Sequence, residues 1–295
     1  MRIGLIDIDS KMPNLALMKL SAYHKSLRDD VFLNNGSIKY DRIYVSCVYD
    51  KNKDQVKGIE FLSDCEVIVG GSGVDLKSEL PEYIERLRPD YDLYPDMDYS
   101  LGFTSRGCNR KCHFCIVPEK EGKFIRWQHP REFHNERFNR IVFLDNNILF
   151  DKEWFYEVME FVKDNNLRFD WNQGLDIRLI DSNIIRTLHE NAPIGTINFA
   201  WDNIELESLV MEKIKLIKKY YTASQTHQTI QFYVFIDSDK EFYSGIYRCR
   251  KLKELNINAF VMFNTKSKRT KRIKRLQRWA NRKWLFWSMD YDEYR

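Results

Sequence analysis

The sequence predicts an α/β protein in three parts: a parallel-sheet domain over residues 1–95, a partial (β/α)6 barrel over residues 96–265, and a basic helical segment over residues 266–295. Short apolar runs alternate with stretches of helical periodicity along most of the chain, which is typical of parallel sheets covered by helices. Residues 81–95 hold three of the chain's seven prolines. That density indicates a surface linker and a domain boundary near residue 95.

The first part contains three predicted strands and one predicted helix. The strands are the apolar runs 3–8, 42–48 and 64–70, and the helix covers residues 14–26. The third strand runs into a turn with Gly70, Gly71 and Gly73. These glycines either end a strand in a tight turn, which is the simpler interpretation, or let the backbone approach a ligand phosphate.

The second part repeats the strand and helix pattern more regularly. Its predicted strands are 99–103, 140–145, 168–173, 196–202, 230–237 and 258–264, and its predicted helices are 154–165, 182–191, 204–220 and 243–255. Six strands in a row with helices between them predict a partial β/α barrel, in which an active site lies at the carboxyl ends of the strands.

Composition and charge fit an intracellular enzyme. The 295 residues are 43% hydrophobic and 31% charged, and no apolar run approaches the length of a membrane span. We therefore expect a cytoplasmic protein without a membrane partner. Six cysteines in a chain of this length are too sparse for a disulfide framework. The net charge is +4, but residues 266–283 hold ten Lys or Arg and no acid, so the rest of the chain is acidic.

Three cysteines carry the strongest chemical signal. Cys108, Cys112 and Cys115 have the spacing C-x3-C-x2-C. A closed zinc site and an ordinary four-iron cluster each need four protein ligands, so three thiolates predict a metal centre with one open position. His113 could complete a zinc site with three cysteines and one histidine, although its place between two of the cysteines makes closure awkward. Cys47, Cys65 and Cys249 are interpreted as small buried residues.

Polar residues follow four consecutive predicted strands of the second part. They are Asp145, Asn146 and Asn147; Asn172, Gln173, Asp176 and Arg178; Asp202 and Asn203; and Asp237, Ser238 and Asp239. Each one alone could be a helix cap or a turn residue. Together they predict a site for a ligand with an amine, a carboxylate and sugar hydroxyls.

The cysteine motif resembles that of the radical S-adenosylmethionine superfamily. Cys108, Cys112, Phe114 and Cys115 match its pattern, and the preceding Gly-Phe-Thr-Ser-Arg-Gly resembles its cobalamin-binding and methylthiotransferase branch. The resemblance implies a Rossmann-like N-terminal domain and a partial TIM barrel. It also implies a [4Fe-4S] cluster whose fourth iron binds S-adenosylmethionine. Reductive cleavage of S-adenosylmethionine would then give a 5′-deoxyadenosyl radical that abstracts a substrate hydrogen. The electron would come from an external flavodoxin-type or ferredoxin-type donor.

The resemblance also implies roles for individual residues. Asp145 or Asn146 is expected to bind the amine of S-adenosylmethionine, and Arg178 its carboxylate. Asp202 is expected to make polar contacts with the cofactor. Phe114 and Gln173 are expected to belong to the same binding site.

Two departures from that branch limit the expectation. Cobalt-ligating relatives carry Asp-x-His-x-x-Gly after the first strand, whereas residues 7–14 here contain neither His nor Gly. Cobalamin is therefore not expected, although binding without a protein ligand to cobalt stays open. Methylthiotransferases carry a second cluster on three N-terminal cysteines, whereas only Cys47 and Cys65 precede the motif here. A second cluster, and methylthiolation by that mechanism, are therefore not expected.

The basic segment predicts a helix with an apolar face of Ile273, Leu276 and Ala280 against the barrel. Its outer face is either a solvated surface or a binding surface, within residues 266–287, for an RNA or nucleotide substrate. Arg272, Arg275 and Arg278 are the phosphate contacts expected in the second case. The alternatives to an enzyme are a zinc or iron–sulfur module for structure or electron transfer, and a nucleic-acid-binding protein.

Overall fold

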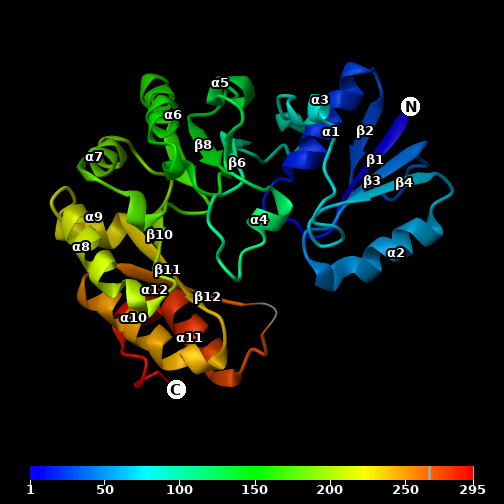
Figure 1. Ribbon diagram of the computed structural model, residues 1–295. Helices are drawn as coiled ribbons and strands as arrows, with labels where there is room; N and C mark the ends of the chain where they lie inside the picture. The colour runs from blue at the N-terminus through cyan, green and yellow to red at the C-terminus, as the bar shows by residue number, and fades with distance from the viewer. Residues whose placement is uncertain (265–266, 295) are drawn as a thin grey trace. The chain divides into compact units, whose positions relative to one another are not determined.

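A computed structural model describes residues 1–264 and 267–294. The chain folds as two compact units, the first formed by Met1–Phe103 and Gln128–Phe138 and the second by Thr104–Trp127 and Asn139–Arg295. The elements of both are labelled in Figure 1. The boundary expected near residue 95 therefore lies inside the first unit. The chain also returns to the first unit after the cysteine loop.

The first unit contains a four-stranded parallel sheet with the order β2-β1-β3-β4. Its strands are β1 (Arg2–Asp7), β2 (Asp30–Leu33), β3 (Arg42–Ser46) and β4 (Glu66–Gly70). This arrangement confirms the predicted parallel sheet, which is Rossmann-like, and three of its strands. The sequence analysis missed β2, a four-residue edge strand that begins with an aspartate.

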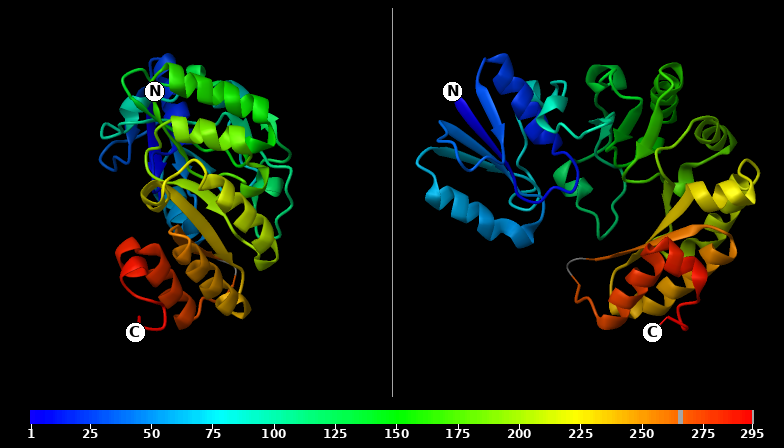
Figure 2. Two further views of the ribbon diagram at one scale, coloured as in Figure 1. Left: turned by 90° about the vertical axis from the view of Figure 1, so that its left-hand side faces the viewer. Right: turned by 180° about the vertical axis from the view of Figure 1, so that it is seen from behind.

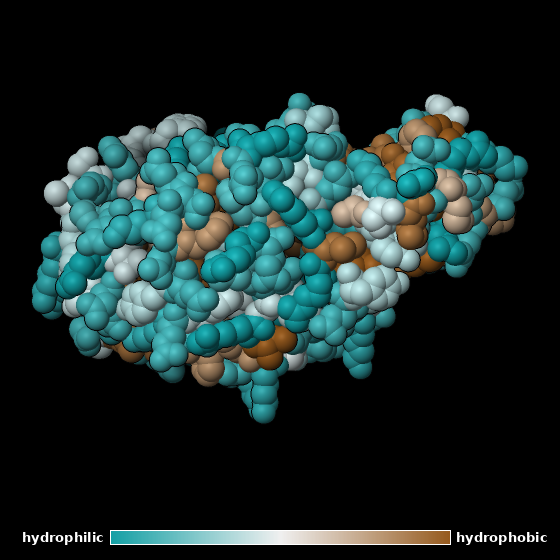
Figure 3. All heavy atoms as spheres, turned by 90° about the horizontal axis from the view of Figure 1, so that it is seen from above, coloured by the Kyte–Doolittle hydropathy of each residue, from teal (hydrophilic) through white to brown (hydrophobic). Residues whose placement is uncertain are grey.

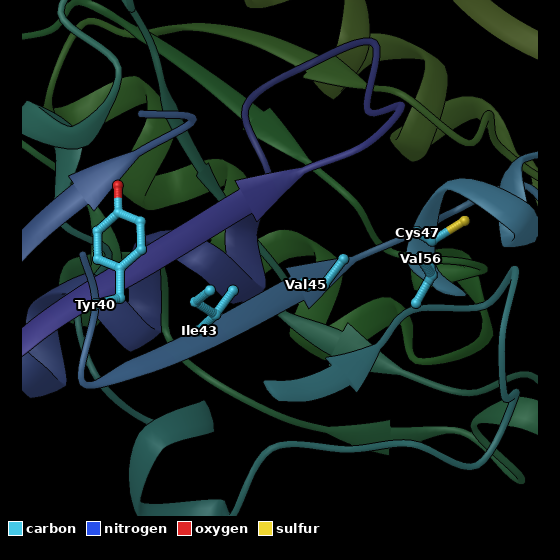
Figure 4. Close-up of a cluster of buried hydrophobic side chains, with 5 residues drawn as sticks. All are labelled: Tyr40, Ile43, Val45, Cys47 and Val56. Atoms are coloured by element: carbon cyan, nitrogen blue, oxygen red, sulfur yellow. The ribbon is translucent and has the colours of Figure 1, made fainter. Parts of the chain in front are cut away.

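Two helices accompany this sheet, α1 (Leu15–Ser26) and α2 (Lys53–Leu62). The side chain of Asn14 caps α1 by accepting a hydrogen bond from the Leu17 N–H at 3.2 Å, which satisfies one of the free amides of the first turn. The predicted helix over residues 14–26 is confirmed, whereas α2 was not predicted. Figure 4 shows part of the core, formed by Tyr40, Ile43, Val45, Cys47 and Val56.

The proline-rich segment 81–95 is not a surface linker, so that expectation was wrong. It contains α3 (Glu82–Glu85) and the 3-10 turn η2 (Tyr91–Leu93), and it buries Ile84, Tyr91 and Leu93. The Tyr91 hydroxyl donates to the Phe133 carbonyl at 2.6 Å within the same unit. Pro81 is the N-cap residue of α3, and the apolar side chains of both turns join the core.

Two further elements complete the first unit. They are β5 (Ser100–Gly102) and α5 (Pro130–Phe133). A Cβ at Gly102 would lie 2.6 Å from the Phe133 ring, so glycine permits this close approach. The strand expected over residues 99–103 is therefore present as β5.

The second unit contains two sets of parallel strands. β8 (Arg140–Phe143) pairs with β9 (Arg168–Trp171), and β10 (Ile197–Ala200), β11 (Ile230–Ile236) and β12 (Asn258–Phe263) form a three-stranded sheet. A single parallel bridge between Leu175 and Phe199 links the ends of the two sets. The five strands confirm the predicted ones. The strands of the described residues form no closed barrel, so the structure shows an α/β protein with several parallel sheets.

Helices follow the strands of this unit in chain order. Figure 2 draws the ribbon from two further sides. They are α6 (Lys152–Asp164), α7 (Ser182–Glu190), α8 (Glu207–Ile217), α9 (Ala223–Thr229) and α10 (Phe242–Glu254). The four predicted helices are present, and α9 is an addition that starts in a capping box between Thr222 and Gln225.

The basic segment forms α11 (Lys271–Asn281) and α12 (Lys283–Ser288). Ile273, Leu276, Trp279 and Ala280 are buried, which confirms the predicted apolar face. Lys266 and Arg295, which belong to the predicted segment, lie outside the described residues.

The face of the molecule drawn in Figure 3 is largely hydrophilic, with hydrophobic atoms in scattered groups. Within residues 1–264 and 267–294, no helix has both the length and the apolar character needed to cross a membrane.

Candidate metal and cofactor site

A cavity of about 690 Å³ lies in the second unit, between the cysteine loop and the carboxyl ends of β8, β9, β10 and β11. Its wall includes all three cysteines of the motif and five of the six residues expected to bind a cofactor. They are Cys108, Cys112, Cys115, Phe114, Asn146, Gln173, Arg178 and Asp202. The structure thus brings together residues that lie almost one hundred positions apart in the sequence.

A short antiparallel hairpin holds the cysteine loop at both ends. Its strands are β6 (Ser105–Arg106) and β7 (Ile125–Arg126), and α4 (Val117–Lys120) lies between them. Gly107 has a φ of +72°, and a Cβ there would lie 2.2 Å from the Lys123 carbonyl oxygen. Glycine is therefore required where the chain enters the loop.

Glu121 connects this loop to the end of β8. Its carboxylate accepts hydrogen bonds from the Gly107 N–H at 3.1 Å, Arg106 Nε at 3.1 Å and Asn146 Nδ2 at 2.8 Å. Asn146, a predicted cofactor residue, is therefore oriented by an acid that the sequence analysis did not single out. Such support fixes a side chain in the wall of a cavity before any ligand arrives.

Asp145 is the one predicted cofactor residue that does not line the cavity. It is 2% exposed, and its carboxylate accepts hydrogen bonds from the backbone N–H and the hydroxyl of both Thr104 and Ser105. Burial raises the pKa of Asp145 to about 6, against the opposite effect of these donors. The structure places Asp145 beneath the cysteine loop, where it anchors the start of the hairpin, and leaves Asn146 as the β8 residue in the wall.

The thiols of the motif face the same space. Cys108 Sγ accepts hydrogen bonds from the Arg110 N–H at 3.4 Å and from Asn147 Nδ2 at 3.7 Å. Burial, together with the neighbouring Cys115, raises the pKa of Cys112. Among the described residues, no three His, Cys, Asp or Glu side chains converge on one point that could hold a single metal ion. A four-iron cube binds each thiolate at a different iron, so its sulfur ligands do not need to meet at a point.

Asn147 carries an unsatisfied acceptor in the cavity wall. The residue is 5% exposed, and its Oδ1 atom has no hydrogen-bond partner in the part of the chain that the structure describes. A buried amide oxygen without a donor is unfavourable, and a ligand donor would satisfy it. In the sequence Asn147 is one of three polar residues after a strand, and no signal separates it from Asn146.

Charged groups form another part of the wall. Asp176 lies between two arginines: Arg178 Nε donates to its Oδ1 at 2.7 Å, and Arg110 Nε donates to its Oδ2 at 2.5 Å. Burial alone would raise the pKa of Asp176, but the Arg178 hydrogen bond and the two positive charges hold it below its usual value. The predicted carboxylate-binding residue Arg178 is therefore held in place, and Arg110 adds a second guanidinium that the sequence analysis missed.

An aromatic pair forms the apolar side of the cavity. The rings of Phe114 and Phe235 stack with centroids 3.8 Å apart at an angle of 23°. Arg248 of α10 is almost fully buried and donates to the carbonyl oxygens of Trp201 at 2.6 Å, Asp202 at 2.9 Å and Phe235 at 2.9 Å. One guanidinium thus ties the ends of β10 and β11 together. No pattern in the sequence distinguishes Arg248 from a surface arginine.

His113 lies at the edge of this cavity. Its side chain is 72% exposed, and Nε2 is 3.8 Å from Asp237 Oδ1. The structure therefore pairs His113 with an acid from the end of β11.

The glycine turn of the first unit serves backbone packing. Gly71 has a φ of +103°, and a Cβ there would lie 2.3 Å from the Cys47 carbonyl oxygen. A Cβ at Gly73 would lie 2.6 Å from the backbone of Tyr49. Asp9 accepts hydrogen bonds at the same edge of the sheet from the N–H groups of Val48 and Tyr49. The strand-terminating turn is therefore the better interpretation of these glycines.

Fold and site together define an α/β protein with a thiol-bearing cavity at the carboxyl ends of parallel strands. No protein-family model and no curated protein matches the chain. Its function is therefore inferred from the chemistry of the residues around the cavity.

Proposed function

We propose that this chain is a radical S-adenosylmethionine enzyme that holds a [4Fe-4S] cluster on Cys108, Cys112 and Cys115. The observation that carries the proposal is the shared cavity: the three motif thiols line it together with polar residues that follow β8, β9 and β10. The parallel order of β8 to β12, with the Leu175–Phe199 bridge, supports the finer proposal that these units are an arc of a partial TIM barrel.

The donor set of the cavity fits such a cluster and its ligand. Three thiols leave one iron without a protein ligand, and the amide and backbone N–H groups at Cys108 can stabilise a thiolate. When bound, the cluster supplies one electron to the sulfonium of S-adenosylmethionine, having received it from an external flavodoxin-type or ferredoxin-type donor.

Residues of the wall would bind and orient the methionine end of the cofactor. The unsatisfied Asn147 Oδ1 can accept a hydrogen bond from its amine, next to the oriented Asn146. The guanidinium groups of Arg178 and Arg110, held by Asp176, can bind its carboxylate. The cavity wall thus favours Asn146 over Asp145 for the amine, adds Asn147 as a further amine contact, and supports the expected role of Arg178.

The remaining wall residues suit the nucleoside end. Burial raises the pKa of Asp202, although Arg248 and Arg178 oppose the shift, so this carboxyl group can take part in hydrogen bonds with sugar hydroxyls. Gln173 lines the same side of the cavity. The stacked Phe114 and Phe235 rings present an apolar surface that excludes water from the reacting centre.

Anaerobic reconstitution tests the proposal. We expect roughly four irons and four sulfides per chain, and 5′-deoxyadenosine release that depends on a reductant and on S-adenosylmethionine. The variant Cys112→Ala should lose both the cluster and the cleavage. Cys65→Ala, which removes a half-buried thiol of the first unit, is the matched control and should keep both.

Three outcomes would contradict the proposal in different ways. Stoichiometric zinc without cleavage would identify a structural metal module. A reducible iron–sulfur cluster that never cleaves S-adenosylmethionine would identify an electron carrier. Cleavage that survives in Cys112→Ala would show that the thiol ligands are assigned incorrectly.

A further inference from the structure

The basic C-terminal segment presents one continuous row of cations to solvent. Lys271, Lys274 and Arg278 are exposed and spaced three and four residues apart on α11, so they share one side of the helix. Arg282 and Lys283 extend the row across the junction with α12, and both are exposed. These five residues are called the outer basic row below.

The other arginines of α11 are engaged within the protein. Arg272 pairs with Asp239, and its guanidinium lies 4.6 Å from the centre of the Phe242 ring. Arg275 donates to the Tyr291 carbonyl at 3.1 Å, and its guanidinium lies 4.6 Å from the centre of the Tyr291 ring. The expectation that Arg272 and Arg275 bind phosphates together with Arg278 is therefore corrected, because only Arg278 belongs to the outer basic row.

No side chain of the outer basic row has an ion pair or hydrogen bond within residues 1–264 and 267–294. The nearby acids are used elsewhere: Asp290 and Asp292 pair with Arg250, and Asp239 pairs with Arg272. Five uncompensated and exposed cations between residues 271 and 283 concentrate positive potential on this segment.

An exposed aromatic ring adjoins the row. Trp284 is 67% exposed and directly follows Lys283. The other tryptophans of the segment are occupied, since Trp279 is fully buried and Trp287 Nε1 donates to Asn258 Oδ1 at 3.0 Å. An exposed indole beside cations offers a flat surface on which a base can stack while its phosphates meet the charges.

We infer that the outer basic row and Trp284 form a docking surface for a single-stranded polynucleotide. Charge complementarity with a phosphate backbone and the stacking surface favour this occupant. A membrane is disfavoured because the apolar face of α11 is already buried, which leaves little apolar surface to enter a bilayer.

The surface also has a structural connection to the cavity. The N-cap of α11, Thr270, donates to Asp239 Oδ1 at 2.6 Å, and Arg272 pairs with the same carboxylate. Asp239 belongs to η6 (Asp239–Glu241), whose Glu241 lines the cavity. The further conclusion that a nucleotide within the bound strand is the substrate rests on the proposed function, whereas binding itself does not.

Fluorescence anisotropy with a labelled single-stranded RNA of about 20 nucleotides tests the inference, with the same sequence as DNA and as a duplex in parallel. The variant Lys271→Gln/Lys274→Gln/Arg278→Gln should weaken binding at least tenfold. It should also reduce the slope of log affinity against log salt concentration by about 2. Trp284→Ala should weaken binding roughly tenfold with little change in that slope.

The matched control removes three charges from another helix of the same unit. Lys215, Lys218 and Lys219 on or next to α8 are exposed, and Lys215→Gln/Lys218→Gln/Lys219→Gln changes the net charge equally. This control should bind as the unmodified chain does. Three results would each overturn the inference. They are an equal loss of RNA affinity in both triple variants, tighter binding of the duplex than of the single strand, and binding of phosphatidylserine vesicles without RNA binding.

The same variants separate this inference from the proposed function. Cys112→Ala should bind RNA normally, and the α11 triple variant should still cleave S-adenosylmethionine. If RNA binding is absent while cleavage is present, the docking surface is refuted and the enzyme proposal stands. If RNA binding is present while cleavage is absent, the enzyme proposal is refuted and the docking surface stands.

Discussion

Three consecutive polar residues after β8 occupy very different places. Asp145 is buried beneath the cysteine loop, whereas Asn146 and Asn147 line the cavity. In the sequence the three cannot be told apart, because consecutive polar residues after a strand form one pattern. What separates them is the position of Thr104 and Ser105, about forty residues earlier, whose four donors meet Asp145. Long-range partners of this kind leave no local pattern.

Asp145 gives a prediction for the pH dependence of stability. Burial raises its pKa to about 6 in the folded chain, whereas an unfolded aspartate has a pKa near 4. The folded chain therefore holds a proton that the unfolded chain releases between these values. The stabilisation that Asp145 contributes should therefore be complete below pH 4. As the pH rises from 4 to 6, the free energy of unfolding should fall by roughly 2–3 kcal/mol.

Urea unfolding of the unmodified chain and of Asp145→Asn across pH 4 to 8 measures this contribution as a difference. The variant should be less stable at every pH, because its amide NH₂ group faces donors of Thr104 and Ser105. The difference in free energy of unfolding between the unmodified chain and the variant should shrink between pH 4 and pH 6 and stay constant above pH 6. A difference that grows with rising pH would show that the four hydrogen bonds outweigh burial and lower the pKa.

At the scale of elements, apolar runs and helical periodicity predicted most strands and helices. The strands of the second unit are buried runs followed by polar residues, so their existence and their ends were both visible in the sequence. The short elements that hold the cysteine loop were not predicted, because β6 and β7 contain two residues each. The stabilising contacts of such elements come from side chains elsewhere, including Glu121 and Asp151.

The start of α6 shows how one side chain fixes a helix to the cysteine hairpin. Asp151 caps α6 by accepting a hydrogen bond from the Trp154 N–H at 3.0 Å. Arg126 of β7 donates to both oxygens of the same carboxylate, at 2.6 and 2.9 Å. The Arg126 hydrogen bonds hold the pKa of Asp151 below its usual value, although burial opposes this shift. A carboxylate with these partners is favoured in its charged form.

Replacement of Asp151 should therefore destabilise the second unit. Asp151→Ala should lower the free energy of unfolding by about 1–2 kcal/mol, because both the cap and the paired charge are lost. Asp151→Asn keeps a capping oxygen and should cost less. Because the folded pKa is lowered, the Asp151 contribution is present above about pH 4 and is lost as pH falls further. Equal stability of Asp151→Ala and the unmodified chain at pH 7 would contradict this role.

At the scale of the whole molecule, the division of the chain could not be read from composition. Proline density at residues 81–95 indicated a linker, yet Ile84, Tyr91 and Leu93 are buried there. Residues 96–103 and 128–138 belong to the first unit with them. The polypeptide thus leaves the first unit, forms the cysteine hairpin in the second, and returns. A boundary that the chain crosses more than once has no single position that a linker could mark.

This arrangement predicts that a fragment beginning at residue 96 will not fold independently. Leu101 and Phe133 belong to the first unit and are almost fully buried, and the Tyr91 hydroxyl donates to the Phe133 carbonyl. Removal of residues 1–95 would expose these side chains and leave that carbonyl without its donor. We expect the fragment 96–295 to aggregate or to unfold without a cooperative transition.

Size-exclusion chromatography and thermal unfolding of the fragment and the full chain give the comparison. Tyr91→Phe in the full chain is the matched control, since it removes only the hydroxyl and should cost about 1 kcal/mol while unfolding stays cooperative. A monomeric fragment 96–295 with a sharp transition, and with the iron content of the full chain after reconstitution, would contradict the division into units. It would show instead that residues 96–103 and 128–138 belong energetically to the cysteine-bearing unit, as the sequence alone had suggested.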